Sequence, residues 1–193
     1  MIIPLTTADS ESVAQLHFDQ LHDDFLPSFG LPFLRVLHQK LIGDPLSIGF
    51  CCKERKKLIG MVIATTNTRQ LLKNVLISGF WQLTPFVLSK IINNPRSVKN
   101  IYETFFYGKS KNNKISAELM IIAVANGYQR QGIGHLLIQK VARELLHRGI
   151  RQFKVGTLAT NTKANAFYKK NSGSLYYSYY LYGKKWHVYQ YNV

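Results

Sequence analysis

The stretch that decides the fold is 115-ISAELMIIAVANGYQRQGIG-134. Residues 115–125 form a strongly apolar run that predicts a strand, and residues 132–148 carry apolar side chains at helical spacing. The turn between them contains Gly132 and Gly134. A glycine turn at the start of a helix exposes unpaired backbone N–H groups beside the positive end of the helix dipole. The stretch therefore predicts a site for a pyrophosphate group, to which Arg130 adds a cation.

Two common phosphate-binding motifs do not fit this turn. No Gly-Lys-Ser or Gly-Lys-Thr follows the glycines, which argues against a nucleoside-triphosphate P-loop. The strand also lies late in the chain, and the pattern around it contains one β-α-β unit, which argues against a dinucleotide-binding domain. The ligand is therefore expected to belong to another class of phosphate compound.

The patterns on either side predict an α+β fold with a mixed sheet. Residues 1–66 predict a strand, two helices and a hairpin, and residues 67–114 predict an insert of two or three short helices. Residues 115–173 predict strand, helix, strand and helix, and residues 174–193 predict two final strands. The length of 193 residues suits one domain with a proper core, so we expect residues 1–193 to fold as a unit.

The turn resembles motif A of the GNAT superfamily of N-acetyltransferases, in the residues Val124-x-x-x-Tyr128-Gln129-Arg130-Gln131-Gly132-Ile133-Gly134. A second element at the distance typical of that family reads Asn161-x-x-Ala164-x-x-Phe167-Tyr168-Lys169-Lys170. The clear resemblance covers residues 115–173. It implies the GNAT fold, in which a mostly antiparallel sheet is flanked by helices. It also implies transfer of an acetyl group from acetyl-CoA to a primary amine, by direct attack in a ternary complex.

The same resemblance implies a set of acetyl-CoA-binding residues. The backbone of residues 122–124 would hold the pantetheine arm and polarise the thioester carbonyl, and residues 129–134 would hold the pyrophosphate. Asn161 would contact the pantetheine near the thiol. The implied set is Ile122, Ala123, Val124, Gln129, Arg130, Gln131, Gly132, Ile133, Gly134, Asn161, Ala164 and Phe167.

Two residues are candidates for catalysis. Tyr168 occupies the position of the family's tyrosine that protonates the departing thiolate, and a neutral phenol suits that task; the alternative is a packed core aromatic. Glu118 is an isolated carboxylate in an apolar strand, costly to bury without a role or a partner. It would accept the amine proton, directly or through a water, and the alternative is an ion pair with a lysine or arginine.

The acceptor end of the site is less defined by the sequence. In the family the end of the first helix borders the acceptor cleft, so His22, Asp23 and Asp24 are candidate substrate-binding or back-up base residues, with solvated surface groups as the alternative. Relatives that acetylate ribosomal-protein N-termini have a glutamate where this chain has Gly156. The family's Gly-Phe after the tyrosine helix is also altered, to 171-NSGS-174.

We expect the acceptor to be a small-molecule amine, such as an amino sugar or its nucleotide-linked form. The helical insert would wall a small pocket, and the acidic first third of the chain would border the approach of a cationic amine. The alternative acceptors are a protein N-terminus or a lysine side chain.

The charge is strongly uneven along the chain. Residues 1–52 hold six acidic and two basic residues, whereas residues 53–193 hold four acidic and 23 basic ones, which gives the net charge of +15. A basic body indicates a polyanionic partner, which is a nucleic acid, a membrane surface or a phosphorylated cofactor. The alternative to an enzyme is therefore a non-catalytic basic module that binds nucleic acid or an anionic membrane.

Neither polyanionic surface is favoured over the cofactor. The chain has no recognisable nucleic-acid-reading motif, so no specific nucleic-acid partner is expected. The apolar segment Val75–Ile92 is able to lie at a bilayer interface, but buried helices that cover the sheet are the favoured interpretation.

Several other classes are expected to be absent. The N-terminus lacks the features of a signal peptide, and polar residues interrupt each long apolar stretch, so no clear membrane span is expected. The two cysteines are adjacent in sequence, which excludes an ordinary disulfide scaffold and favours a reduced, cytoplasmic location. The histidines show no metal-ligand spacing, so no metal is expected. The oligomeric state stays open, with a homodimer among the alternatives.

Overall fold

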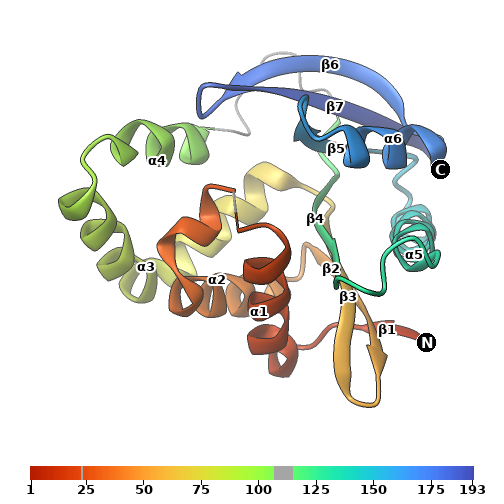
Figure 1. The fold of residues 1–193 in the computed structure, drawn as a ribbon, viewed down its shortest axis with the longest axis horizontal. Coiled ribbons are helices and arrows are strands. Elements are labelled where there is room, and N and C mark those ends of the chain that lie inside the picture. The colour runs from red at the N-terminus through yellow and green to blue at the C-terminus, as the bar shows by residue number, and fades with distance from the viewer. Residues whose placement is uncertain (23, 107–114) are drawn as a thin grey trace.

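A computed structural model describes residues 1–22, 24–106 and 115–193 of the chain. In this part, seven strands form one sheet in the order β1-β2-β3-β4-β5-β7-β6 (Figure 1). The strands are β1 (Ile2–Pro4), β2 (Ser47–Glu54), β3 (Lys57–Thr65), β4 (Glu118–Val124), β5 (Gln152–Leu158), β6 (Ser174–Leu181) and β7 (Lys184–Asn192). Neighbouring strands run antiparallel except β4 and β5, which run parallel. The predicted mixed, mostly antiparallel sheet is confirmed.

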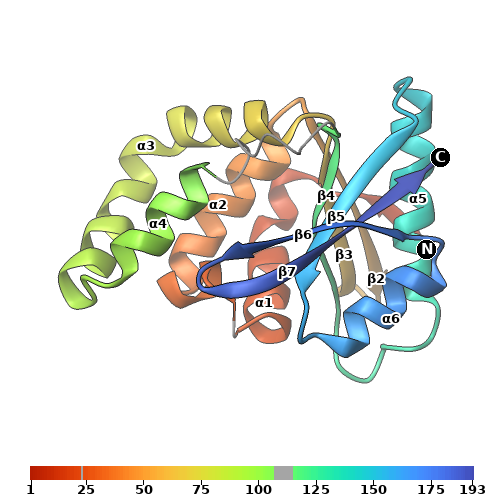
Figure 2. The same ribbon diagram turned by 90° about the horizontal axis from the view of Figure 1, so that it is seen from above.

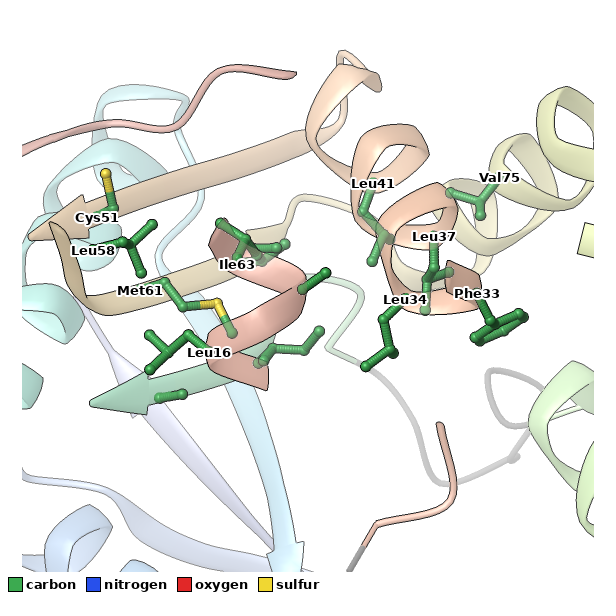
Figure 3. Close-up of a cluster of buried hydrophobic side chains, with 14 of the residues drawn as sticks. Leu16, Phe33, Leu34, Leu37, Leu41, Cys51, Leu58, Met61, Ile63 and Val75 are labelled. Carbon is green, nitrogen blue, oxygen red and sulfur yellow. The ribbon is translucent and has the colours of Figure 1, made fainter. Parts of the chain in front are cut away.

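Helices cover both faces of the sheet. The described helices are α1 (Ser10–Gln20), α2 (Leu31–Gly43), α3 (Thr68–Asn93), α4 (Ser97–Phe106), α5 (Ile133–His147) and α6 (Thr162–Lys170), with short 3-10 turns at Thr7–Asp9 and Leu26–Phe29. One apolar core lies between α1, α2 and one face, and Val75 of α3 joins it (Figure 3). A second core lies between the other face and α5, with Phe167 and Tyr168 of α6 against it.

The predicted insert of short helices is wrong in one respect, because residues 68–93 form the single helix α3. Pro85 lies inside it and removes the backbone donor to the carbonyl of Trp81, a residue that is 85% exposed. Asn67 caps the start of the helix by accepting from the N–H of Gln70. The predicted loop over residues 108–114 lies outside the described residues.

The expectation that Val75–Ile92 is mostly buried is also wrong. The helix packs against α2 and the segment at 26–29 rather than on the sheet, so it lies along an outer edge of the molecule (Figure 2). Its buried side is formed by Leu71, Val75, Gly79 and Leu83, and large apolar side chains on the other side stay exposed. By length and composition α3 is the one helix of the described chain that is apolar enough to cross a membrane, although no clear span was expected.

A buried histidine pair joins α1 to α2. His17 Nδ1 and His38 Nε2 lie 2.8 Å apart, and both side chains are buried. Burial lowers the pKa of His17 to about 4, and burial together with His17 lowers the pKa of His38 to about 3. Both rings are therefore neutral near pH 7 and serve as core hydrogen-bonding groups.

Candidate active site

An opening between β4 and β5 forms the centre of the site. The two strands pair at Glu118–Lys154 and Leu119–Val155, and the structure describes no further pair beyond Leu119. The N–H of Ala125 donates to Ile59 on β3. Because backbone groups alternate along a strand, those of Val124 and Ile122 point away from β3 and toward the opening. By the same alternation, the backbone groups of Ala123 point toward β3.

The turn after β4 leads directly into the start of α5. Gly132 is the N-cap residue and has a φ of +82°, in the left-handed region that favours glycine. A Cβ built on Gly132 would meet nothing within 4 Å, so the space above this position is open. The first N–H groups of α5 have no partner within the helix and point toward this space. The turn therefore has the geometry that the sequence-based prediction of an anion site requires.

Side chains of the turn itself hold it in shape. Gln129 Nε2 donates to the Val124 carbonyl at 3.0 Å, and Gln131 Nε2 donates to the Gly127 carbonyl at 2.8 Å. Tyr128 Oη donates to Glu54 Oε2 of the β2–β3 hairpin at 2.6 Å. In this structure both glutamine side chains bind backbone of the same turn. They therefore shape the candidate pyrophosphate site at residues 129–134, which we call the pyrophosphate seat. Arg130 is exposed, with a φ of +62°.

Helix α6 packs closely against the start of α5. A Cβ on Gly134 would lie 3.0 Å from the Phe167 ring, so a larger residue there would press on the ring and glycine favours the close contact of the two helices. Asn161 caps α6 by accepting from the N–H of Ala164 at 3.0 Å. Phe167 and Ala164 lie partly buried against the core beside α5. These contacts bring the two sequence elements, 124–134 and 161–168, to the same end of the sheet.

Asn165 is a positioning residue that the sequence analysis missed. Its Nδ2 donates to the carbonyl of Leu158 at 2.9 Å and to that of Asn161 at 2.6 Å, and its Oδ1 accepts from Tyr189 Oη at 2.8 Å. The side chain thus ties the end of β5 and strand β7 to the start of α6. An asparagine four residues after a helix cap carries no sequence signal for this role.

Tyr168 lies on the inner side of α6 with 5% of its surface exposed. Its ring contacts those of Phe167 and Tyr189, and its carbonyl accepts from Tyr191 Oη at 3.2 Å. Burial raises the pKa of Tyr168 above its ordinary value, because the phenolate would be poorly solvated. The phenol is therefore held protonated, the state that a proton donor needs.

Glu118 is buried at the start of β4 and is paired with a lysine. Thr68 Oγ1 donates to Glu118 Oε2 at 2.8 Å, and Lys154 Nζ lies 3.4 Å from the same oxygen. Lys154 also donates to the carbonyl of Ile115 at 3.0 Å, and burial lowers its pKa, an effect that Glu118 partly offsets. The ion pair anticipated as the alternative role of Glu118 is thus present. Lys154 was missed, although a lone lysine between the apolar residues 153 and 155 was a signal of a buried partner.

A pocket of about 330 Å³ lies beside the end of β5. Three segments distant in sequence wall it, namely the α1–α2 connection, the α3–α4 junction and the β6–β7 hairpin. Its lining residues are Asp24, Phe25, Ser28, Lys90, Asn94, Arg96, Ser97, Asn100, Leu158, Tyr182, Lys184 and Trp186. Most of them come from regions where sequence reasoning named no site residue.

The walls of this pocket are tied to each other. The ring of Phe25 lies 4.9 Å from that of Tyr182, and Tyr182 Oη lies 2.8 Å from Thr104 Oγ1. Glu103 accepts from the backbone N–H of Tyr182. Lys90 Nζ donates to the carbonyl of Ser28 at 2.8 Å. Helices α3 and α4 therefore fix both the hairpin and the α1–α2 connection in place.

A row of aromatic rings on β6 and β7 leads from this pocket toward Glu118. The rings of Trp186 and Tyr179 are 6.4 Å apart, and those of Tyr179 and Tyr177 are 5.9 Å apart. Burial, with the nearby charge of Glu118, raises the pKa of Tyr177 to about 12. The row connects the pocket to the carboxylate proposed to accept a proton.

The charge of the pocket differs from the expectation. Lys90, Arg96 and Lys184 line it against one described carboxylate, Asp24. The other described acids of the first third are engaged elsewhere: Asp9 pairs with Lys53, for example, and Glu11 with Arg35. The pocket is therefore basic. Asp24 lines it; His22 is not among its lining residues, and Asp23 lies outside the described residues.

The described residues suit acetyl-CoA better than a metal. No group of three or more His, Cys, Asp or Glu side chains gathers anywhere in the described ranges. The open space above Gly132 is one that a side chain would fill, and the N–H groups at the start of α5 are the donors that a pyrophosphate accepts. The outward-facing backbone of Ile122 and Val124 is suited to pairing with the amide groups of an extended pantetheine arm.

Comparison with solved structures shows the same fold at low sequence identity. The ribosomal-protein-S18-alanine N-acetyltransferase of Escherichia coli is 14% identical, with a TM-score of 0.64 over 100% of this chain and 93% of that one. The ribosomal-protein-alanine N-acetyltransferase of Brucella melitensis is also 14% identical, with a TM-score of 0.65 over 100% and 99% of the chains. The PaiA N-acetyltransferase of Thermoplasma acidophilum, solved in complex with coenzyme A, is 12% identical, with a TM-score of 0.62 over 100% and 98%.

Comparison of the sequence with curated proteins found no match. The family model of the Acetyltransferase (GNAT) family, however, matches residues 17–173, which include both sequence motifs, strands β2 to β5, the end of α1 and the other five described α-helices. The resemblance inferred from the sequence is thereby confirmed. The chain belongs to the GNAT family of acetyltransferases.

Proposed function

We propose that this protein is an acetyl-CoA-dependent N-acetyltransferase that acetylates a primary amine of a small, negatively charged molecule by direct attack in a ternary complex. The observation that carries the proposal is the opening between β4 and β5. At its end lies the pyrophosphate seat on α5, and beside the end of β5 lies the basic pocket on the α1–α2 side of the sheet. The two substrates would meet across this opening.

The chain supplies the cofactor contacts mainly through its backbone. Gly132, Ile133 and Gly134 present the first N–H groups of α5 to the pyrophosphate, and Arg130 adds a charge. Ile122 and Val124 would pair with the pantetheine arm as an added strand would. Asn161 would contact the same arm from the start of α6. Acetyl-CoA, when bound, supplies an acetyl group already activated as a thioester.

Tyr168 and Glu118 would move the protons. The buried, protonated phenol of Tyr168 would donate to the leaving thiolate. The amine must lose a proton to act as a nucleophile, and Glu118 would accept it, directly or through a water. Thr68 and Lys154 hold the Glu118 carboxylate in one position. The proton would therefore have to reach this carboxylate from a fixed direction.

The charge of the pocket supports the class of acceptor. Three cationic side chains facing one described carboxylate would favour an amine that carries a phosphate or carboxylate group. An amino sugar linked to a nucleotide has both the amine and a diphosphate. The aromatic rings of Phe25, Tyr182 and Trp186 offer flat surfaces for a sugar or base.

The experiment is an acetyl-transfer assay that follows free thiol with a panel of amines. The panel includes nucleotide-linked amino sugars, free amino sugars, polyamines, amino acids and peptides that begin with alanine. Turnover should be fastest with an anionic amine. Faster turnover with a peptide would instead assign a protein acceptor, as in the ribosomal-protein enzymes of similar fold, and no turnover with any amine would contradict the proposal.

A further inference from the structure

Helix α3 is apolar on two opposite sides, and the fold covers one of them. Leu71, Val75, Gly79 and Leu83 recur every four residues and are buried, toward α2. A helix that is apolar all round is normally enclosed by protein or by lipid. In this structure α3 lies along an outer edge of the molecule, so its second side faces outward (Figure 2).

The uncovered side carries large side chains in a stripe along the helix. Ile77, Trp81, Leu88 and Ile92 are 68%, 85%, 53% and 78% exposed, and Phe80 beside them is 53% exposed. Their spacing places these residues on one face, opposite to the buried one. A contiguous exposed stripe of this kind marks an interaction surface rather than the scattered apolar residues of an ordinary surface. We call these five residues the α3 stripe.

The charge around the α3 stripe is positive. The sequence has no acidic residue between Glu54 and Glu103, and it has eight basic residues in that interval. Arg69 and Lys73 are exposed on the first turns of α3, and Arg96 is exposed just beyond its end. Two acidic residues accept hydrogen bonds from α3 in the described structure, namely Asp44 from Asn74 and the buried Glu118 from Thr68.

We propose that the α3 stripe docks the enzyme on an anionic membrane surface, with its apolar side chains in the headgroup region and the flanking cations against lipid phosphates. An apolar helix face bordered by Lys and Arg, with a tryptophan at its centre, is the pattern of helices that lie in a bilayer interface. A second copy of this chain would bring two basic surfaces together, and like charges oppose that contact. The charge thus selects an anionic lipid surface as the occupant.

The helix lies on the membrane rather than across it. Its length and composition would allow a span, but Leu71, Val75 and Leu83 are part of the core that α3 shares with α2. Crossing the bilayer would expose that core and remove Thr68 from Glu118. Lys90 and Asn94, at the far end of the helix, line the acceptor pocket, so docking would hold that pocket near the membrane surface.

The test is flotation of the purified full chain with vesicles of phosphatidylcholine alone or mixed with phosphatidylglycerol. We expect the protein to float with the mixed vesicles, less so with phosphatidylcholine, and less as salt screens the charges. The emission of Trp81 should shift to the blue on binding, and Trp81→Phe should lose that shift. The double variant Ile77→Ser/Leu88→Ser should bind about 10-fold more weakly.

The matched control is Leu146→Ser/Leu175→Ser, which removes two similarly exposed leucines from α5 and β6. It should float like the wild type. Equal binding to both kinds of vesicle, equal loss in the control, or no flotation at all would overturn the proposal. So would a dimer in sedimentation equilibrium that Ile77→Ser/Leu88→Ser dissociates, because the stripe would then be a subunit interface. None of these readouts depends on acetyl transfer, so they are independent of the proposed reaction.

Discussion

The two proposed substrate sites of this protein are built in different ways. The cofactor seat consists of backbone from one stretch of chain, from β4 through the turn to the start of α5. The acceptor pocket consists of side chains from three segments that are far apart in sequence. The first is fixed by local geometry, in particular by a left-handed Gly132, whereas the second is fixed by contacts such as Phe25–Tyr182 and Lys90–Ser28. A change of side chains in the pocket should therefore leave the backbone of the seat unchanged.

The Glu118–Lys154 pair lies where β4 and β5 are still paired, and the loss of its lysine should have the largest effect. Lys154→Met should lower the free energy of unfolding by about 3–5 kcal/mol, because it leaves a buried carboxylate without its cation. Urea unfolding at neutral pH measures this loss. The double variant Glu118→Leu/Lys154→Met should recover most of the stability, since a buried ion pair exchanged for apolar groups is close to neutral.

The same double variant separates two roles of Glu118. If Glu118 accepts the amine proton, the refolded double variant stays nearly inactive, and the activity of Glu118→Gln recovers partly at high pH, where the amine is already neutral. Full turnover by the double variant would show that Glu118 has only a structural role where β4 pairs with β5.

Tyr168 tests the link between the seat and the chemistry. Tyr168→Phe removes one hydroxyl and should lower kcat roughly 100-fold, as expected for loss of a general acid. Acetyl-CoA affinity should stay near that of the wild type, because the phenol is assigned to the leaving group. High pH should not rescue this variant. A kcat within about twofold of the wild type would reduce Tyr168 to a packed core aromatic.

The buried histidine pair between α1 and α2 should make the folded protein less stable in acid. Their folded pKa values of about 4 and about 3 lie below the ordinary 6.5, so the unfolded chain binds protons that the folded chain does not. Stability should thus be full above pH 6.5 and fall as the pH drops toward 4. Between pH 7 and 4.5 the wild type should lose roughly 2 kcal/mol more than His38→Gln, measured by urea unfolding. Equal losses would contradict the burial of His38.

Arg96 tests whether the pocket binds an anion. Arg96→Gln should raise the KM for an anionic amine about 10-fold and leave acetyl-CoA affinity unchanged. The matched control is Arg143→Gln, which removes an exposed arginine of α5 outside the pocket. Neither substitution should change the KM for an analogue of the amine that lacks the anionic group. If Arg96→Gln also raised the KM for this analogue, Arg96 would not act by binding the anionic group of the substrate.

The contrast between the sites also explains what the sequence could predict. The glycine turn and the Asn161 cap are short-range features whose spacing is visible in one stretch of sequence. The order of helices and strands along the chain follows from apolar periodicity. Lys90, Arg96 and Lys184 lie about ninety residues apart at the extremes, and only the tertiary fold brings them to one pocket. The chain has 25 lysines and arginines, so the sequence alone could not single out these three.

The helix α3 shows a second reason for error. Gly79 and Pro85 indicated breaks, but the helix continues through both, and Gly79 packs closely against Leu83 and against Lys40 of α2. Local breaker signals were overridden by packing against α2. Periodicity also failed to show which side of α3 is covered, because both sides are apolar.

The central claim is that the turn between β4 and α5 binds acetyl-CoA, and isothermal titration of two glycine variants tests it most directly. Gly132 and Gly149 lie at opposite ends of α5, both with positive φ and both with open space where a Cβ would be. Aspartate at either position strains the backbone equally, but at Gly132 it places a carboxylate in the pyrophosphate seat. The wild type and Gly149→Asp should bind one acetyl-CoA with similar affinity, and Gly132→Asp should lose at least about 100-fold. Unchanged affinity in a folded Gly132→Asp, or an equal loss in Gly149→Asp, would contradict the account.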